Sequence, residues 1–422
     1  MGSRINKDKP RLVLIGNGMA GIRTLEELLA IAPDRYSISV VGEEHHSHYN
    51  RILLSPVLAG EKTVDQIYLK DDDWYRQQGI FFFKGEKAIR IDRARRMVHM
   101  ASGLTLPYDK LILATGARPA TLPVPGNHLN RLLTFRDIRD VDQMLQLSRQ
   151  LRRVAVIGGG LLGLEAANGL RQQGMDVTVV HSSTHLLNKQ LDATAAQLLQ
   201  QTLEHKGIHF RMNTRTCEFL GDGDNNVRGI QFTDGNHLDT DMVIVATGIV
   251  PNTELARASG LQCDNGVMVT DTMQTYDPAI YAVGECIQHR GRLFGLVAPL
   301  YDQARVCANH LAEMGIAHYQ HKAEATKLKI TGINAFSAGH FLGDENCDII
   351  SFHDRTQGIY KKLVIRDQHL AGVILYGDTQ DGAWFFDLIR QKTDITPWRD
   401  QLVFGRDFCN TASEPKPIPV AA

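Results

Sequence analysis

The sequence predicts an α/β protein with two duplicated parallel-sheet domains and a smaller C-terminal α+β domain. Two apolar strands run into the same glycine pattern, Gly-x-Gly-x-x-Gly, which begins at Gly16 and again 142 residues later at Gly158. Each copy is followed at a distance by a strand that ends in Ala-Thr-Gly, at residues 114–116 and 246–248. Such an internal duplication indicates two related domains. After residue 328 the pattern changes to consecutive strands, which indicates a separate domain.

The first copy has every part of a dinucleotide fingerprint in order. The apolar strand Arg11–Ile15 leads to Gly16 for a tight turn, Gly18 for close approach of a pyrophosphate, and Gly21 for helix–strand packing. A helical pattern follows, and its N-terminus offers free N–H groups to phosphates. The next strand, 36–42, ends at Glu43, whose carboxylate can accept hydrogen bonds from a ribose hydroxyl. These features predict a Rossmann-like dinucleotide-binding domain.

Residues 44–119 add loops, short helices and further strands. Strands are expected at 80–83 and 86–91, and a hairpin turn at Ser102-Gly103. The buried strand 111–114 then runs into Thr115-Gly116, where a small residue and a glycine let the backbone approach a ligand. Arg118 could reach a phosphate from this loop.

The second copy repeats the pattern of strand, glycine turn and helix after an amphipathic helix at 136–151. The strand 153–157 leads to Gly158, Gly160 and Gly163, and the following helix carries Glu165. The next strand, 177–180, is followed by His181 instead of an acid. Near residue 280 another strand ends at Gly284-Glu285, where a backbone amide and a carboxylate can meet a polar cofactor chain. Residues 295–314 are expected to form a helix entered after Pro299.

The C-terminal region alternates strands from residue 328 onward and ends with a helix at 383–390. The segment 406–422 contains three prolines and is expected to be a flexible tail.

Composition excludes several classes of function. The chain has 422 residues, is 43% hydrophobic and 22% charged, and carries a formal net charge of −1. These values are typical of a soluble globular protein and do not favour nucleic-acid binding. No apolar run is long enough to span a bilayer, and the polar N-terminus lacks a signal-peptide core. We therefore expect a cytoplasmic protein that binds neither nucleic acid nor membrane.

Neither the cysteines nor the clustered histidines predict a metal or redox site. None of the six cysteines forms C-x-x-C, so packed thiols in a reducing compartment are expected. The cluster of His45, His46 and His48 has no partner pair at helical spacing. We predict no metal site and name no catalytic side chain.

The motifs together resemble the two-dinucleotide-binding-domain flavoprotein reductases, whose fold is glutathione-reductase-like. The resemblance covers roughly residues 10 to 405. It implies a discontinuous FAD-binding domain (1–119 and 249–318), an NAD(P)H-binding domain (120–248), a C-terminal interface domain (319–405) and a tail (406–422). Four sequence segments narrow the resemblance further: HYNRILLSPVLAG, VIGGGLLGLEAANGL, IYAVGEC and TKLKITGINAFSAG. These segments look like the flavin module of assimilatory nitrite reductase large subunits and the electron-transfer subunits of assimilatory nitrate reductases.

By this resemblance, the residues expected near each cofactor can be named. The FAD set is Gly16, Gly18, Met19, Ala20, Gly21, Glu43, Arg51, Ala88, Thr115, Gly116, Arg118, Gly284 and Glu285. The NAD(P)H set is Gly158, Gly160, Leu161, Leu162, Gly163, Glu165, His181 and Gly248.

The resemblance implies an NAD(P)H:acceptor oxidoreductase that passes electrons through FAD to a separate redox protein. That partner would be a nitrate or nitrite reductase catalytic subunit or an iron–sulfur carrier. His181 leaves the choice between NADH and NADPH open, and the family makes NADH the expected donor. The cysteine-rich and sirohaem regions of large nitrite reductases do not follow here, so the chain is not expected to reduce nitrite by itself. The helix 21–32 and the segment 48–55 lack the redox cysteines of disulfide reductases and NADH oxidases.

Two alternatives stay open at this point. One is a rubredoxin- or ferredoxin-type reductase, and the other is a flavin-bearing NADH-sensing interaction protein. Lys327 and Lys329 lie on one face of a predicted strand. They form either a solvated face or a docking site near the flavin, which a double Lys→Ala variant would test through its electron-transfer rate.

Overall fold

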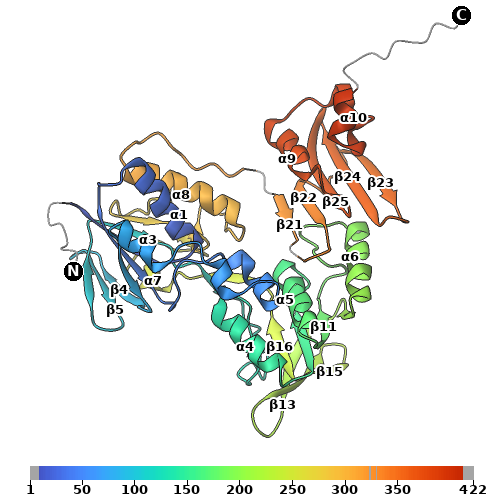
Figure 1. The fold of residues 1–422 in the computed structure, drawn as a ribbon, viewed down its shortest axis with the longest axis horizontal. Helices are drawn as coiled ribbons and strands as arrows, with labels where there is room; N and C mark the ends of the chain where they lie inside the picture. Colours follow the sequence, from blue (N-terminus) through green and yellow to red (C-terminus); the bar gives the residue numbers. More distant parts are fainter. Residues whose placement is uncertain (1–8, 323–324, 329, 412–422) are drawn as a thin grey trace, which may run out of the picture. The chain divides into compact units, whose positions relative to one another are not determined.

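The computed structural model describes residues 9–322, 325–328 and 330–411, and its chain divides into two compact units (Figure 1). The first unit comprises Met1–Ala120, Arg136–Val141 and Gly248–His321. The second comprises Thr121–Phe135, Asp142–Thr247 and Lys322–Ala422. The first unit thus contains both parts of the predicted FAD domain. The second joins the predicted NAD(P)H and C-terminal domains. Within the described part of the chain, no helix has the length and apolar character needed to cross a membrane.

A five-stranded parallel sheet organises the first unit, in the order β19-β7-β1-β2-β3. Because all five strands run the same way, their carboxyl ends gather at one edge, where open α/β sheets bind ligands. The strands are β1 (Arg11–Ile15), β2 (Ser37–Gly42), β3 (Phe81–Lys84), β7 (Lys110–Leu113) and β19 (Ile280–Ala282). Their near-continuous apolar sequences are typical of strands buried on both faces.

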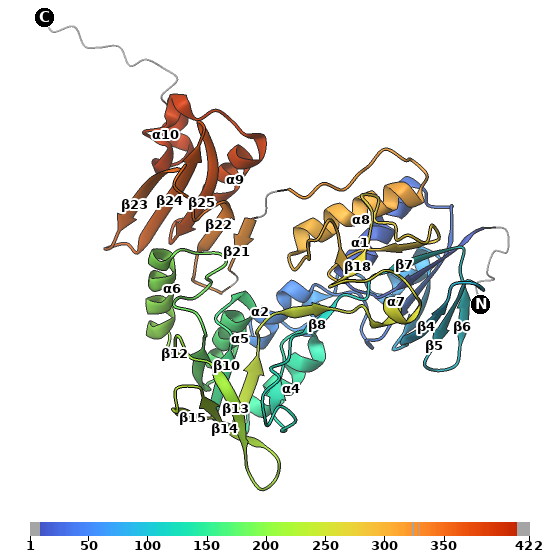
Figure 2. The same ribbon diagram turned by 180° about the vertical axis from the view of Figure 1, so that it is seen from behind.

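Two helices from opposite ends of this unit lie side by side, α1 (Met19–Ile31) and α8 (Val297–Leu311) (Figures 1 and 2). The hydrophobic core joins them to the parallel sheet and to a small antiparallel sheet. That sheet comprises β4 (Ala88–Asp92), β5 (Met97–Met100) and β6 (Thr105–Pro107). Helix α8 begins at Val297, before the predicted entry after Pro299, because a proline is tolerated in the first turn of a helix, where no N–H is needed.

A second parallel sheet repeats this arrangement in the second unit, in the order β12-β11-β10-β16-β9. Its strands are β9 (Leu132–Leu133), β10 (Arg153–Ile157), β11 (Asp176–Val180), β12 (Ile208–Arg211) and β16 (Met242–Val245). Helices α5 (Leu161–Gln172) and α6 (Ala193–His205) follow β10 and β11. An antiparallel sheet of β13 (Thr216–Gly221), β14 (Val227–Phe232) and β15 (His237–Asp239) precedes β16.

The duplication extends to a pair of charged forks that the sequence analysis did not find. At the start of β1, Arg11 donates from its backbone N and its Nε to Asp109, at 2.7 and 2.9 Å. At the start of β10, Arg153 makes the same two bonds to Asp241, at 2.9 and 3.3 Å. Each aspartate directly precedes the strand that leads into Ala-Thr-Gly, which is β7 for Asp109 and β16 for Asp241. Each domain therefore contains the same Arg–Asp hydrogen bonds as well as the same glycine turn.

The C-terminal part of the second unit is an antiparallel sheet in the order β21-β22-β25-β24-β23. Its strands are β21 (Ala325–Lys327), β22 (Ala335–Gly339), β23 (Asp348–Asp354), β24 (Ile359–Arg366) and β25 (His369–Tyr376). Helix α9 (Gly382–Gln391) lies against this sheet (Figure 1). Helix α10 (Arg406–Thr411) occupies the start of the segment predicted as a tail, because Cys409 is buried in the domain's core. The rest of that segment, 412–422, lies outside the described residues.

Shorter elements connect these layers. They are η1 (Arg51–Leu53), α2 (Leu54–Leu58), η2 (Val64–Ile67), α3 (Asp72–Gln77), β8 (Ala117–Pro119), α4 (Ile138–Ser148), β17 (Ile249–Pro251), α7 (Glu254–Ala258), β18 (Val267–Met268), β20 (Ile287–Gln288), η3 (Thr396–Trp398) and η4 (Leu402–Phe404). Of the two lysines considered for docking, Lys327 is exposed at the end of β21, and Lys329 lies outside the described residues.

Candidate dinucleotide sites

The turn after β1 has three glycines with three different surroundings. Gly16 has φ +109°, and a Cβ there would lie 2.1 Å from the Ala114 carbonyl oxygen. A Cβ at Gly21 would lie 2.9 Å from the Gly16 oxygen, so α1 can contact the turn only without a side chain. At Gly18, by contrast, a Cβ would meet nothing within 4 Å. Two glycines thus make the turn, and the third leaves open space at the helix N-terminus.

The end of β19 reaches the same N-terminus. Gly284 has φ +97°, and a Cβ there would lie 3.1 Å from the Cβ of Ala20 in α1. Its N–H donates to Gln303 Oε1 at 2.9 Å. Gln303 is completely buried, and its Nε2 has no hydrogen-bond partner. A buried donor without a partner is costly, so a polar group supplied by a cofactor would fit here. Gln303 is not predictable from the sequence, because a glutamine inside a helix belongs to no recognisable motif.

The Thr115-Gly116 loop is fixed by one residue that sequence reasoning also missed. Asn252 donates from Nδ2 to the Thr115 carbonyl at 2.8 Å, and its own carbonyl accepts from Thr115 Oγ1 at 2.8 Å. The Asn252 N–H donates to the Gly116 carbonyl at 2.9 Å. Arg118 is half exposed and forms an ion pair with Glu254 at 2.5 Å. Arg118 therefore has a protein partner, and its role at a phosphate stays a prediction.

Glu285 is held by an arginine 149 residues away in the sequence. Its carboxylate forms a mostly buried ion pair with Arg136, whose backbone carbonyl accepts from Arg51 Nη1 at 3.1 Å. Arg51 in turn pairs with Glu44 and lies over the ring of Tyr49, 5.0 Å from its centroid. These two ion pairs are joined by the hydrogen bond from Arg51 to the Arg136 carbonyl, which brings the predicted residues Arg51 and Glu285 into one network. Arg136 and Glu44 were not predicted, because nothing in the local sequence marks their distant partners.

Glu43, Ala88 and Met19 occupy the remaining predicted FAD positions. Glu43 follows β2, is largely exposed, and pairs with Lys87 at 2.9 Å. Ala88 is the next residue and begins β4. Met19 is the first residue of α1 and is buried.

The turn after β10 repeats the first turn in the second unit. Gly158 has φ +125°, and a Cβ there would lie 2.3 Å from the Ala246 carbonyl oxygen. A Cβ at Gly163 would lie 1.9 Å from the Gly158 oxygen, whereas one at Gly160 would meet nothing within 4 Å. Gly160 is the N-cap of α5 and has no side-chain cap. As in the first turn, the open space lies at the uncapped N-terminus of the helix, here α5.

His181 lies against this second turn. Its Nδ1 accepts a hydrogen bond from the Gly159 N–H at 3.1 Å, and its Nε2 is buried without a partner. Burial lowers the pKa of His181 below its usual value, so the ring is neutral at pH 7. A Cβ at Gly159 would lie 2.8 Å from the ring. A side chain at Gly159 would therefore displace the His181 ring from the turn.

The other residues predicted for NAD(P)H are differently placed. Leu161 and Leu162 begin α5, with Leu162 42% exposed, and Glu165 is buried one turn later. Gly248 belongs to the first unit, where it has φ +127° and open space at the Cβ position.

The six cysteines are all free. Burial raises the pKa of the Cys286 thiol, which contacts the carbonyl oxygens of Val283 and Leu113 at 3.3 and 3.7 Å. Burial also raises the pKa of Cys307. A buried thiol with a raised pKa is a poor nucleophile.

The three clustered histidines have separate partners. His46 Nδ1 lies 2.9 Å from Tyr68 Oη. The His45 ring packs against Gly85, where a Cβ would lie 2.4 Å from its Cε1. His48 is buried 3.3 Å from the Asn17 carbonyl, and burial lowers its pKa to about 4.

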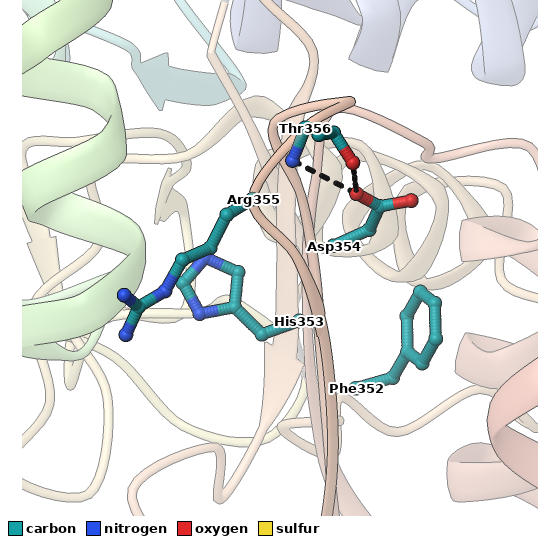
Figure 3. Close-up of a pocket in the computed structure, with 5 residues that line it drawn as sticks. All are labelled: Phe352, His353, Asp354, Arg355 and Thr356. Carbon is teal, nitrogen blue, oxygen red and sulfur yellow. Dashed lines mark hydrogen bonds between the residues drawn. The ribbon is translucent and has the colours of Figure 1, made fainter.

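A shallow pocket lies at the tip of the β23–β24 hairpin (Figure 3). Its lining residues alternate, with Phe352 and Asp354 on one side of the strand and His353 and Arg355 on the other. Asp354 accepts bonds from the N–H and hydroxyl of Thr356, at 2.9 and 2.5 Å. None of the predicted cofactor residues lines it.

The residues present fit two dinucleotides. Each unit offers an uncapped helix N-terminus, a glycine with open space, and a buried polar atom without a partner, Gln303 Nε2 in one and His181 Nε2 in the other. Helix N-termini of this kind bind phosphate groups.

Comparison with known proteins gives the family. The model of the pyridine nucleotide-disulphide oxidoreductases matches residues 10–310, and that of the rubredoxin NAD+ reductase C-terminal domain matches residues 325–393. Nitrite reductase [NAD(P)H] of Bacillus subtilis (strain 168) is 46% identical over 388 residues, covering 92% of this chain and 48% of that protein. The assimilatory nitrate reductase electron transfer subunit of the same organism is 45% identical over 395 residues, covering 94% and 51%. The chain spans about half the length of these curated relatives.

Among solved structures, the covalent putidaredoxin reductase–putidaredoxin complex contains a chain with a TM-score of 0.85 and 28% identity. The match covers 96% of this chain and 99% of that chain. The predicted fold class and the predicted resemblance to flavoprotein reductases, including the nitrite and nitrate reductase modules, are confirmed. The chain belongs to the pyridine nucleotide-disulphide oxidoreductase family.

Proposed function

We propose that this chain is an FAD-dependent reductase that oxidises NADH and passes the electrons to a separate redox protein. The observation that carries the proposal is the repetition of one geometry. Both units place a glycine of positive φ, an open glycine and a free helix N-terminus after the central strand of a parallel sheet. Two such sites in a chain without a paired or exposed redox thiol favour transfer between two dinucleotides.

In this proposal the first unit binds FAD and the second binds the nicotinamide dinucleotide. Bound FAD would supply the hydride-accepting and electron-releasing chemistry. The protein's part is binding and orientation. The helix N-terminus at Gly18 faces the pyrophosphate, Glu43 binds the adenosine ribose, and Gly284 with Glu285 binds the polar chain next to the flavin. The Arg136 ion pair holds the Glu285 carboxylate in place. Domains are proposed as in the sequence analysis, with residues 319–405 as the interface domain.

NADH is the proposed donor because the position after β11 carries no cation. A 2′-phosphate is bound by an arginine near this position. The neutral His181 ring instead accepts at Nδ1 from the Gly159 N–H, so its proton is on Nε2, which can donate. Such a ring suits a ribose hydroxyl.

The proposed acceptor is a nitrate or nitrite reductase catalytic partner or an iron–sulfur carrier. The support is the relatives' names, a nitrite reductase and a nitrate reductase electron transfer subunit. A second candidate, a rubredoxin- or ferredoxin-type reductase, is favoured by the match of residues 325–393. The cytoplasmic location predicted from the sequence stays a prediction.

An anaerobic titration with NADH and then NADPH, followed by the visible flavin spectrum, tests the reductase step. Bleaching by NADH at much lower concentration than by NADPH supports the proposal. A flavin that neither nucleotide reduces would contradict it and favour an NADH-sensing protein. Turnover with a set of iron–sulfur proteins and rubredoxin then separates the two classes of acceptor. Gly160→Ala should weaken NADH binding, whereas Gly223→Ala, which also has open space, should not.

A further inference from the structure

Three potential metal ligands converge on one loop of the C-terminal sheet, far in sequence from either dinucleotide fingerprint. The loop connects β22 to β23 and carries His340, Asp344 and Cys347. One ligand atom from each lies within 4.8 Å of the other two. From the sequence alone, no metal site is predicted and Cys347 is expected to be a packed thiol.

The loop is shaped by its own backbone. The His340 N–H donates to the Ala371 carbonyl at 2.8 Å, which attaches the start of the loop to the sheet. Two turns follow, with Gly343 N donating to the His340 carbonyl at 3.2 Å and Cys347 N to the Asp344 carbonyl at 3.0 Å. Gly343 has φ +74°, a conformation that favours glycine. These bonds place the ligands before any ion is present.

The side chains already contact one another. His340 Nε2 lies 3.5 Å from Asp344 Oδ2, and Cys347 Sγ lies 3.4 Å from Asp344 Oδ1. In tetrahedral zinc sites, ligand atoms about 2.0–2.3 Å from the metal are about 3.5 Å apart. Small side-chain rotations would therefore bring the three atoms to coordination distance.

A protein cation now occupies this position. Arg366 Nη2 pairs with Asp344 Oδ2 and also lies 3.4 Å from Cys347 Sγ. The cluster is thus a place where positive charge is stabilised by two of the three ligands. A metal ion would compete with this guanidinium for both.

We propose that His340, Asp344 and Cys347 form a binding site for a divalent transition-metal ion of the zinc class. Imidazole, carboxylate and thiolate together suit Zn²⁺, whereas Mg²⁺ and Ca²⁺ prefer oxygen ligands alone. His340 and Asp344 are exposed and Cys347 is half-buried, so water completes a tetrahedral set. Binding releases the thiol proton of Cys347 to solvent and displaces Arg366 from Asp344. The metal ion exchanges with solvent and is not required for folding, because Arg366 pairs with Asp344 and contacts Cys347 in the absence of metal.

Calorimetric titration of the full, untagged chain with zinc chloride tests the site. We expect one ion per chain, with affinity at least about tenfold lower in Cys347→Ser and in His340→Ala. The matched control is Cys217→Ser, another half-buried thiol of the same unit, bonded to the Gln231 carbonyl. Arg366→Gln should bind more tightly than the unmodified chain, because the competing cation is gone. Equal binding by the unmodified, Cys347→Ser and His340→Ala chains would overturn the proposal.

A second measurement needs no variant. Zinc should slow alkylation of Cys347 by iodoacetamide, followed by peptide mass spectrometry, and should leave Cys217 unchanged. Equal alkylation of Cys347 with and without saturating zinc would also overturn the proposal. Neither result depends on FAD reduction.

Discussion

The glycines of the two turns separate a folding role from a binding role at the scale of single residues. A Cβ at Gly16 or Gly158 would strike a backbone carbonyl of the neighbouring strand. A Cβ at Gly18 or Gly160 would strike nothing in the protein. No protein atom within 4 Å of that position therefore requires glycine in the second pair, which supports the proposed role of Gly18 and Gly160 in binding a pyrophosphate.

Gly18→Ala should leave the stability of the flavin-free protein unchanged and weaken FAD binding, because the added methyl projects into the proposed pyrophosphate position. Gly16→Ala should destabilise the flavin-free protein itself, by at least about 2 kcal/mol, through strain and the 2.1 Å contact with Ala114. Urea unfolding of the flavin-free proteins and flavin content after dialysis check both. Full flavin content in Gly18→Ala would contradict the assignment of this turn.

The Arg136–Glu285 pair is a second prediction at this scale. Both side chains are less than a fifth exposed, so removing one partner leaves a charge with little solvent. Glu285→Leu should cost about 3 kcal/mol of unfolding free energy, and Arg136→Met with Glu285→Leu should recover part of it. The exposed pair of Arg152 and Asp176 provides a control, since Asp176→Asn should change stability by less than about 0.5 kcal/mol. Additive losses in the double variant would argue against a coupled pair.

At the scale of elements, one aspartate serves both a helix and a sheet. Asp192 is the N-cap of α6, where its Oδ1 accepts from the Ala195 N–H at 3.0 Å. Its Oδ2 accepts from Tyr360 Oη of β24 at 2.8 Å and lies 3.5 Å from Lys362 Nζ. Tyr376 of β25 reaches α6 as well, 2.7 Å from Thr202 Oγ1. These bonds join α6 to the C-terminal sheet within the second unit.

Asp192→Ala should therefore cost more than an ordinary helix cap, which contributes about 1 kcal/mol. We expect about 2–3 kcal/mol, because Tyr360 and Lys362 lose a partly buried acceptor too. Tyr360→Phe isolates the inter-element bond and should cost about 1 kcal/mol. Chemical denaturation of the three proteins checks the order, and equal losses for Asp192→Ala and Tyr360→Phe would show that the cap contributes nothing.

At the scale of the whole molecule, the two Arg–Asp forks link stability to pH. The hydrogen bonds from Arg11 and Arg153 lower the pKa values of Asp109 and Asp241 in the folded protein. A carboxyl with a lowered folded pKa stabilises the fold above its unfolded pKa of about 3.9, and that contribution is lost as the pH falls through the folded value. The forks are partly exposed, so each contributes about 1 kcal/mol or less.

Asp109→Asn and Asp241→Asn should thus be less stable than the unmodified chain at pH 7, and the difference should shrink below pH 4. Thermal unfolding at several pH values measures this. Asp34→Asn, at a largely exposed aspartate paired with Lys9, serves as the control with no comparable loss. A difference that persists unchanged at pH 3 would assign the effect to lost packing instead of charge.

The sequence predicted the parts of the molecule that depend on local chemistry. The strand, the glycine turn and the helix are consecutive in each copy, over residues 11–31 and 153–172, so both turns could be located from periodicity and Gly-x-Gly-x-x-Gly alone. Asn252, Gln303 and Arg136 act on residues that lie 19 to 149 positions away, and no local pattern encodes such a partner. The start of α8 and the helix at Arg406–Thr411 differ from prediction for smaller reasons. Proline is permitted in a first turn, and a burial site for Cys409 is visible only in three dimensions.

The strand order of the first unit has a consequence for protein synthesis. Strand β19 pairs with β7, yet 166 residues separate their ends, Leu113 and Ile280. On the ribosome, β1, β2, β3 and β7 emerge long before β19, Gly284 and α8 exist, whereas all five strands of the second parallel sheet have emerged by Val245. Domains fold as units during translation. The domain of the second parallel sheet can therefore be completed before the domain of the first, although the first begins earlier in the sequence. A nascent chain stalled before residue 280 should then bind NADH but retain no flavin.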